Sequence, residues 1–132
     1  MHILVVDDSS TMRRILSKTL ARLGFTDTSE APNGHAALEQ MHATPVDLVI
    51  VDWHMPGMSG IELVRTIRSS PATRDVPVLM VTANAAPDDI VHAVRAGISG
   101  YVVKPFTGEI LARKVADVLG PPAPSAQPGQ PR

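Results

Sequence analysis

Residues 48 to 60 read LVIVDWHMPGMSG, and this stretch decides the fold. Four apolar residues in a row, Leu48 to Val51, run directly into Asp52, and turn-forming Pro56 and Gly57 follow. An apolar run without polar alternation is typical of a strand buried on both faces of a parallel sheet. A carboxylate at the end of such a strand is costly unless other groups use it, so Asp52 is the first candidate for a functional residue.

Similar short runs rich in Val, Ile and Leu recur on both sides of this stretch. They predict strands near residues 2–6, 27–31, 47–51, 77–81 and 101–103. Helical periodicity fills the gaps, and it predicts helices from just after Ser9 to Leu23 and near residues 33–42, 59–69, 87–96 and 107–119. Five alternating strands and helices predict an α/β fold with a five-stranded parallel sheet, doubly wound with right-handed crossovers.

The apolar positions predict which face of each helix is buried. In the first helix the stripe includes Ile15 and Leu16, and in the third helix it includes Leu63, Val64 and Ile67. In the fourth helix we expect the inward residues to be Ile90, Val91 and Val94.

The length and composition exclude several classes of protein. The 132 residues suffice for one compact domain, which we expect to span residues 1–119. Residues 120–132 are rich in proline and predict a flexible C-terminal tail. The formal charge of −1 and the scarcity of aromatic residues argue against nucleic acid or membrane partners. With no cysteine, no leader-like start and no long apolar run, we expect a cytoplasmic monomer.

Polar side chains stand at the ends of four predicted strands. Because the carboxyl ends of parallel strands meet at one edge of the sheet, we expect these side chains to converge. Each also has a simpler interpretation: Asp8 and Ser9 as helix caps, Thr82 as a buried hydroxyl, and Lys104 as a solvated charge. The converging residues are Asp7, Asp8, Asp52, Thr82 and Lys104.

The joint arrangement points to phosphoryl chemistry. Two carboxylates 4 Å apart repel by ~4 kcal/mol at an effective dielectric constant near 20, so a divalent cation and Lys104 would relieve the cluster. The hard oxygen ligands favour Mg²⁺. Asp52 would then act as the nucleophile that forms an acyl phosphate, with Thr82 and Lys104 contacting the phosphoryl oxygens.

Four segments carry a resemblance to a known family: VVDDSSTMRRIL, VDWHMPGMSGIELVRTIR, PVLMVTANA and GYVVKPFTGEI. They closely resemble the receiver domain of two-component response regulators, and especially the stand-alone chemotaxis regulators of that family. The similarity covers about residues 2–119 and implies a (βα)5 fold of the flavodoxin-like type. It implies Asp7, Asp8, Asp52 and the backbone carbonyl of His54 as the Mg²⁺ site, and Asp52 as the phosphoacceptor.

The resemblance also implies roles for residues around that site. Thr82 and Lys104 match the switch hydroxyl and the phosphate-contacting lysine, and Tyr101 matches an aromatic side chain that changes rotamer on phosphorylation. The Lys104–Pro105 bond is expected to be cis. His54, where the family often has a polar side chain such as Asn, and Asn84 should flank the path of the hydrolytic water and tune hydrolysis of the acyl phosphate.

The resemblance further implies a sensor histidine kinase, similar to the chemotaxis kinase, or a phosphotransfer protein as the phosphodonor. The flagellar motor switch is the expected output partner. The chain would not be an enzyme beyond catalysing its own phosphorylation and dephosphorylation. The acidic Asp88 and Asp89 differ from the lysine-rich sequence of well-known enteric regulators at the face that binds the motor switch.

Alternative functions stay open at this point. A stand-alone receiver could serve a non-motility phosphorelay or drain phosphate from a kinase. A Mg²⁺-dependent aspartyl phosphohydrolase would use the same nucleophile, but such enzymes usually carry a second acid two residues later, where His54 stands. A flavin carrier of similar fold would need a neutral phosphate-binding loop after the first strand, where Asp7 and Asp8 would repel the phosphate.

Overall fold

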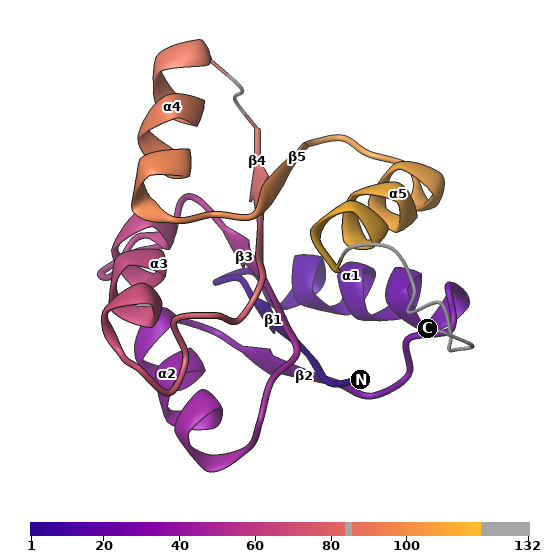
Figure 1. Cartoon of the computed structure of the whole chain (residues 1–132). Coiled ribbons are helices and arrows are strands. Elements are labelled where there is room, and N and C mark those ends of the chain that lie inside the picture. The colour runs from indigo at the N-terminus through magenta and orange to yellow at the C-terminus, as the bar shows by residue number, and fades with distance from the viewer. Residues whose placement is uncertain (84–85, 120–132) are drawn as a thin grey trace, which may run out of the picture.

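A computed structural model describes residues 1–83 and 86–119 of the chain. Within these residues, strands and helices alternate (Figure 1). Asn84 and the tail predicted for residues 120–132 lie outside the described residues. The strands are β1 (Ile3–Val6), β2 (Thr28–Ala31), β3 (Leu48–Asp52), β4 (Val78–Thr82) and β5 (Gly100–Val103). The helices are α1 (Ser10–Arg22), α2 (Gly34–Ala43), α3 (Gly60–Ser69), α4 (Pro87–Ala96) and α5 (Gly108–Leu119).

The five strands form one parallel sheet in the order β2-β1-β3-β4-β5, which confirms the predicted fold class. The chain moves outward from β1 to β2 and then returns to place β3 on the other side of β1. The switch in strand order therefore lies between β1 and β3. In open α/β sheets this is the point where a crevice forms at the carboxyl ends of the strands.

Helices cover both faces of the sheet, as Figure 1 shows, with α1 and α5 on one face and α2, α3 and α4 on the other. Each face has its own apolar core. Leu16 and Leu20 of α1 pack in the same cluster as Leu111 and Val115 of α5. The opposite cluster contains the predicted inward residues of α3, which are Leu63, Val64 and Ile67. The two cores hold the strands rigidly between them.

Local capping fixes the starts of two helices beside the carboxyl edge of the sheet. The hydroxyl of Ser9 accepts a hydrogen bond from the backbone N–H of Met12 at 3.1 Å, so the expected capping role of Ser9 is real. At α3, Ser59 and Glu62 form a reciprocal capping box. Both helices therefore begin at defined positions, immediately after the loops that follow β1 and β3.

The structure corrects the predicted inward faces of two helices. In α4, Ala93 and Ala96 are buried, whereas Val91 and Val94 are 50% and 57% exposed. In α1, Ile15 is also largely exposed. The reason in α4 is that it packs beside α3 with its small residues inward, and alanines allow a closer approach than valines would. The periodicity of these helices identified an apolar stripe on each, but it did not show which edge of the stripe packs against the rest of the protein.

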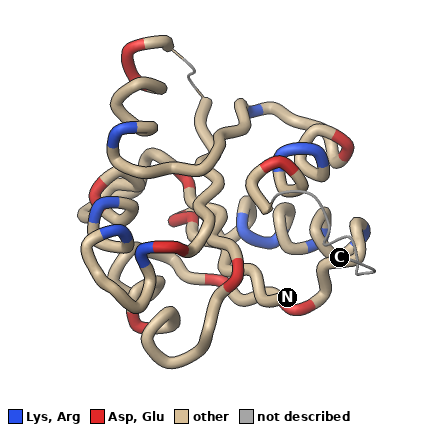
Figure 2. Tube along the Cα trace, in the orientation of Figure 1, with Lys and Arg blue, Asp and Glu red and all other residues tan. Residues whose placement is uncertain are grey.

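The charges of α4 follow the helix dipole. Asp88 and Asp89 lie in its first turn and Arg95 in its last, as the red and blue segments of this helix in Figure 2 show. Gly97 ends the helix with a φ of +115°, a left-handed conformation that favours glycine. Across residues 1–83 and 86–119, no helix combines the length and the apolar character needed to cross a membrane.

Candidate functional site

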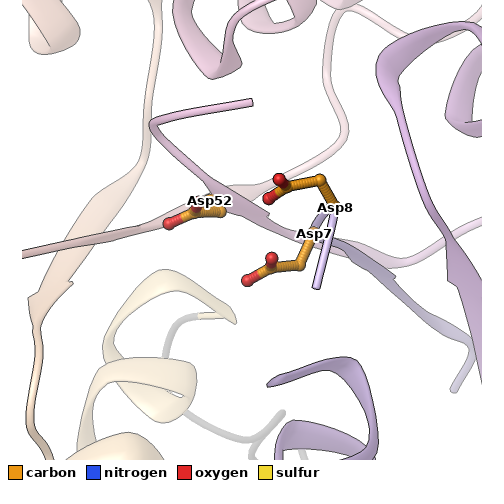
Figure 3. A group of neighbouring side chains, drawn as sticks. All are labelled: Asp7, Asp8 and Asp52. Carbon is orange, nitrogen blue, oxygen red and sulfur yellow. The ribbon is translucent and has the colours of Figure 1, made fainter. Parts of the chain in front are cut away.

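Three carboxyl groups meet at the carboxyl edge of the sheet. Asp7 and Asp8 follow β1, and Asp52 is the last residue of β3, the neighbouring strand. Their side chains project into the same space (Figure 3), and each offers an oxygen within 4.8 Å of the others. Asp7 and Asp52 are buried and Asp8 is exposed, so the cluster opens to solvent on one side.

The carboxyl group of Asp7 lies in surroundings that disfavour its ionised form. Only 2% of the residue is exposed, and its Oδ2 atom is buried without a hydrogen-bond donor. Burial raises the pKa of Asp7 above its ordinary value, and the charge of Asp52 and the carboxyl group of Asp8 raise this pKa further. The backbone N–H of Ser9, which donates to Oδ1 at 2.8 Å, and the charge of Lys104 partly oppose that rise in pKa.

Lys104 provides the cation predicted for this edge. It follows β5, and its Nζ atom donates a hydrogen bond to Oδ1 of Asp52 at 3.1 Å. The backbone N–H of Lys104 donates to the carbonyl of Thr82 at 2.8 Å, which ties the loop after β5 to the end of β4. The Lys104–Pro105 peptide bond is cis. The simpler interpretation of Lys104 as a solvated charge is therefore wrong.

A small cavity of about 110 Å³ opens beside this cluster. Its lining residues are Trp53, His54, Thr82 and Asp89. Thr82 is 1% exposed at the end of β4, whereas His54 is exposed and its ring stacks on Trp53 with the centroids 6.2 Å apart. The structure therefore brings Thr82 and His54 together at the lining of one cavity, with Trp53, the residue next to Asp52, in the same lining.

Tyr101 lies in β5 and packs against the apolar core on the face covered by α2, α3 and α4. It is half-buried in β5, where it is paired in register with Met80 of β4. Its ring lies under Lys114 of α5, whose Nζ atom is 5.4 Å from the ring centroid. Tyr101 thus links β5 to α5 rather than lining the cavity beside Asp52.

Two residues near the site were missed by sequence reasoning. Asp89 was recognised only as part of an acidic helix start, yet it lines the cavity with Thr82 and His54. The signal was present in Pro87, because a helix that begins so soon after β4 places its first turn at the carboxyl edge. Arg13, whose guanidinium reaches the backbone of Asp7, had no local signal in the sequence.

Gly60 allows the loop after β3 to fold tightly against Asp52. Its backbone N–H donates to the carbonyl of Trp53 at 3.0 Å. A Cβ atom at this position would lie 2.5 Å from the carbonyl oxygen of Asp52 and 3.0 Å from the Cα of Trp53. Because both obstacles are backbone atoms, only glycine fits here, and the start of α3 can pack closely against the backbone of Asp52 and Trp53.

The donor set fits a hard divalent cation. The buried and unpartnered Oδ2 of Asp7 lies in a cluster with oxygens of Asp8 and Asp52, and such a cluster repels itself without a cation. Carboxylates with carbonyl and water ligands are the usual donors for Mg²⁺. Asp7, Asp8 and Asp52 are therefore the residues that could hold the ion.

Comparisons with known proteins agree with this geometry. The family model described as "Response regulator receiver domain" matches residues 3–116. Chemotaxis protein CheY of Pseudomonas aeruginosa is 50% identical over 119 residues, which cover 90% of this chain and 96% of that protein. Chemotaxis protein CheY-3 of Vibrio cholerae is 48% identical, with 90% and 92% covered.

Solved structures show the same architecture. The crystal structure of chemotaxis protein CheY4 of Vibrio cholerae at low pH superposes with a TM-score of 0.84 and 32% identity, covering 89% of this chain and 97% of that chain. The strand order found here is also the one of flavodoxin and CheY, and in flavodoxin-like sheets of this order the ligand FMN lies at the β1/β3 switch point.

Proposed function

This chain belongs to the family of response regulator receiver domains, and we propose that it is a response regulator that accepts a phosphoryl group on Asp52. Receivers of this family act as signalling regulators, and the chain matches them over almost all of residues 1–119. The observation that carries the proposal is the cluster of Asp7, Asp8 and Asp52, with Lys104 Nζ at 3.1 Å from Asp52.

The phosphoryl transfer uses groups already in place around Asp52. A carboxylate oxygen of Asp52 attacks the phosphorus of a phosphohistidine, the new O–P bond forms, and the N–P bond breaks. The electron pair of that bond stays on the imidazole nitrogen of the donor, which takes up a proton. Lys104 stabilises the negative charge on the transferred phosphoryl oxygens, because its ammonium group already contacts Asp52.

Asp7, Asp8 and Asp52, with the backbone carbonyl of His54, would hold Mg²⁺ at this edge. When bound, the ion supplies positive charge beside the phosphoryl oxygens. Asp7 presents its unpartnered Oδ2 to the site, and the exposed Asp8 lies on the side that opens to solvent. Asp52 is the last residue of β3, and its carboxylate is oriented by the hydrogen bond from Lys104.

The hydroxyl of Thr82 is the switch. A phosphoryl group on Asp52 offers a new acceptor next to the end of β4, and the hydroxyl of Thr82 moves to bond with it. That movement frees space for Tyr101 and alters the surface of α4, β5 and α5. This surface exposes Val91, Val94 and Val103, which suits a surface that binds another protein.

The proposed phosphodonor is a sensor histidine kinase, similar to the kinase of chemotaxis systems, or a phosphotransfer protein. The proposed output is flagellar motor switching, because the similar proteins from Pseudomonas aeruginosa and Vibrio cholerae are chemotaxis proteins. The acidic first turn of α4 favours one second candidate, a receiver that serves a pathway other than motility.

His54 and Asn84 are proposed to tune hydrolysis of the acyl phosphate, with His54 exposed at the cavity beside Asp52.

Fluorescence of Trp53, the only tryptophan, tests the phosphoacceptor because this residue follows Asp52 directly in the chain and lines the cavity with Thr82. Native protein should respond to Mg²⁺ and then to acetyl phosphate, and the Asp52→Asn variant should lose the second response. A folded native protein that responds to neither would overturn the proposal. Tracking the swimming of cells that carry only Asp52→Asn distinguishes the outputs: altered reversals support motor control, and unchanged swimming supports the second candidate.

A further inference from the structure

Arg13 connects the first helix to the backbone of the acidic pair. It lies in α1, and its Nη1 atom donates a hydrogen bond to the carbonyl oxygen of Asp7 at 2.6 Å. Only 16% of the side chain is exposed. A short bond from a charged, mostly buried donor is among the stronger hydrogen bonds in proteins, so this contact holds the end of β1 firmly.

Glu30 on β2 fixes the orientation of that guanidinium. The Nε atom of Arg13 lies 3.1 Å from Oε1 of Glu30. Glu30 is itself held from two helices, because Ser17 of α1 donates to its Oε2 at 3.4 Å and Gln40 of α2 donates to its backbone carbonyl at 2.7 Å. The planar fork of Arg13 therefore bridges β2 and the end of β1.

These contacts leave one atom of Asp7 available. Its backbone N–H donates to the carbonyl of Ala31 at 3.2 Å, its carbonyl accepts from Arg13, and its Oδ1 accepts from the N–H of Ser9. Its Oδ2 is buried without a donor and belongs to the acidic cluster. Arg13 thus completes a set of bonds that leaves Oδ2 as the single free acceptor of the side chain.

We propose that Arg13, oriented by Glu30, is a positioning residue for the cation site, which holds the backbone of Asp7 so that Oδ2 is presented to a bound Mg²⁺. The inference rests on the proposed Mg²⁺ site. The guanidinium of Arg13 bonds to the backbone carbonyl of Asp7 and to Glu30, so it acts through the peptide unit of Asp7. Groups that orient metal ligands in this way commonly change metal affinity when they are removed.

The direction in which Mg²⁺ affinity changes when Arg13 is replaced distinguishes a positioning role from a purely electrostatic one. A guanidinium close to a cation site repels the cation, so removing its charge alone would tighten Mg²⁺ binding. Loss of positioning has the opposite effect, since Asp7 must then be ordered when the ion binds. The neighbouring Arg14 is exposed and carries the same charge, which makes it a matched control.

Mg²⁺ titrations followed by Trp53 fluorescence test the proposal in the full chain. The Arg13→Met variant, which keeps an apolar stem, should bind Mg²⁺ about tenfold more weakly than native protein. Arg14→Met should bind as native or slightly more tightly. Arg13→Lys should remain weaker than native, because an ammonium group cannot span Glu30 and the Asp7 carbonyl as the fork does.

Amide hydrogen exchange without any metal gives a second readout. The N–H of Ser9, which donates to Asp7, should exchange faster in Arg13→Met, while the N–H of Val49 in β3, which donates to Pro77, should not change. Native Mg²⁺ affinity in Arg13→Met, or full recovery in Arg13→Lys, would overturn the role of Arg13. Native protein that fails to bind Mg²⁺ would instead overturn the proposed cation site, and the exchange of Ser9 would still report on the positioning.

Discussion

Lys104 Nζ lies 3.1 Å from Asp52 Oδ1, so a cation from the loop after β5 reaches the end of β3 across the intervening strand β4. The contact places one positive charge inside a cluster of three carboxylates. Lys104 therefore competes with a bound cation for Asp52, and it also stabilises a phosphoryl group on the same residue. This double role makes opposite predictions for metal binding and for phosphorylation.

Replacing Lys104 with Met should separate the two effects. Mg²⁺ should bind more tightly, because the competing charge is gone. Phosphorylation by acetyl phosphate should slow by at least about tenfold, because a positioned donor to the transferred oxygens is lost. Both are measured by Trp53 fluorescence, with Lys18→Met as the control for an exposed lysine of α1. An unchanged phosphorylation rate in Lys104→Met would contradict the assigned role.

The stability of the metal-free protein should depend on Asp7. Because its folded pKa is raised from the ordinary value of 3.8, folding takes up a proton between the two pKa values, and stability falls as pH rises through that window. At pH values above the folded pKa of Asp7, the full cost of holding its ionised carboxylate in the buried cluster lowers the free energy of unfolding. Asp7→Asn should therefore stabilise the protein at pH 7 without Mg²⁺ by about 1 kcal/mol, and the gain should vanish below the unfolded pKa.

Thermal or urea unfolding in a chelator measures that gain across pH. Asp8→Asn is the matched control, and its gain should be smaller because Asp8 is exposed. With saturating Mg²⁺, native protein should instead be more stable than Asp7→Asn. The bound ion stabilises the native cluster, whereas Asp7→Asn has lost one of the ligands. An Asp7→Asn variant that is less stable than native protein at neutral pH in chelator would show that Asp7 is not strained.

Gly60→Ala tests the close packing of the start of α3 against the backbone of Asp52. The new Cβ would lie 2.5 Å from the carbonyl oxygen of Asp52, so we expect a loss of about 2–3 kcal/mol in unfolding free energy. Gly108→Ala is the control, because Gly108 also begins a helix and its nearest neighbour would be 3.7 Å away. That change should be neutral or stabilising. Equal stability of the two variants would contradict the close approach at Gly60.

His54→Asn tests the proposed tuning of hydrolysis. The imidazole lies at the cavity beside Asp52 and stacks on Trp53, so a smaller side chain should open the path for water. We expect the acyl phosphate to decay several-fold faster, measured as loss of radiolabelled phosphate from the protein after the donor is removed. His35→Asn, an exposed residue of α2, should leave the decay unchanged. Equal decay of native protein and His54→Asn would rule out this role.

The sequence by itself determined the alternation of elements and the edge at which the site forms. The apolar runs specify parallel strands, and the carboxyl ends of parallel strands must share one edge, so Asp7, Asp52, Thr82 and Lys104 had to converge. Capping at Ser9 is equally local, because a side chain and an amide three residues later suffice for it.

Only the tertiary structure decided how these groups are held. The exposure of Val91 and Val94 depends on how α4 seats against α3, which no periodicity in α4 specifies. The free Oδ2 of Asp7 depends on bonds from Ala31, Ser9 and Arg13 together. The contact of Lys104 with Asp52 joins residues 52 positions apart. Such features arise from packing between distant segments, and local sequence patterns carry no information about that packing.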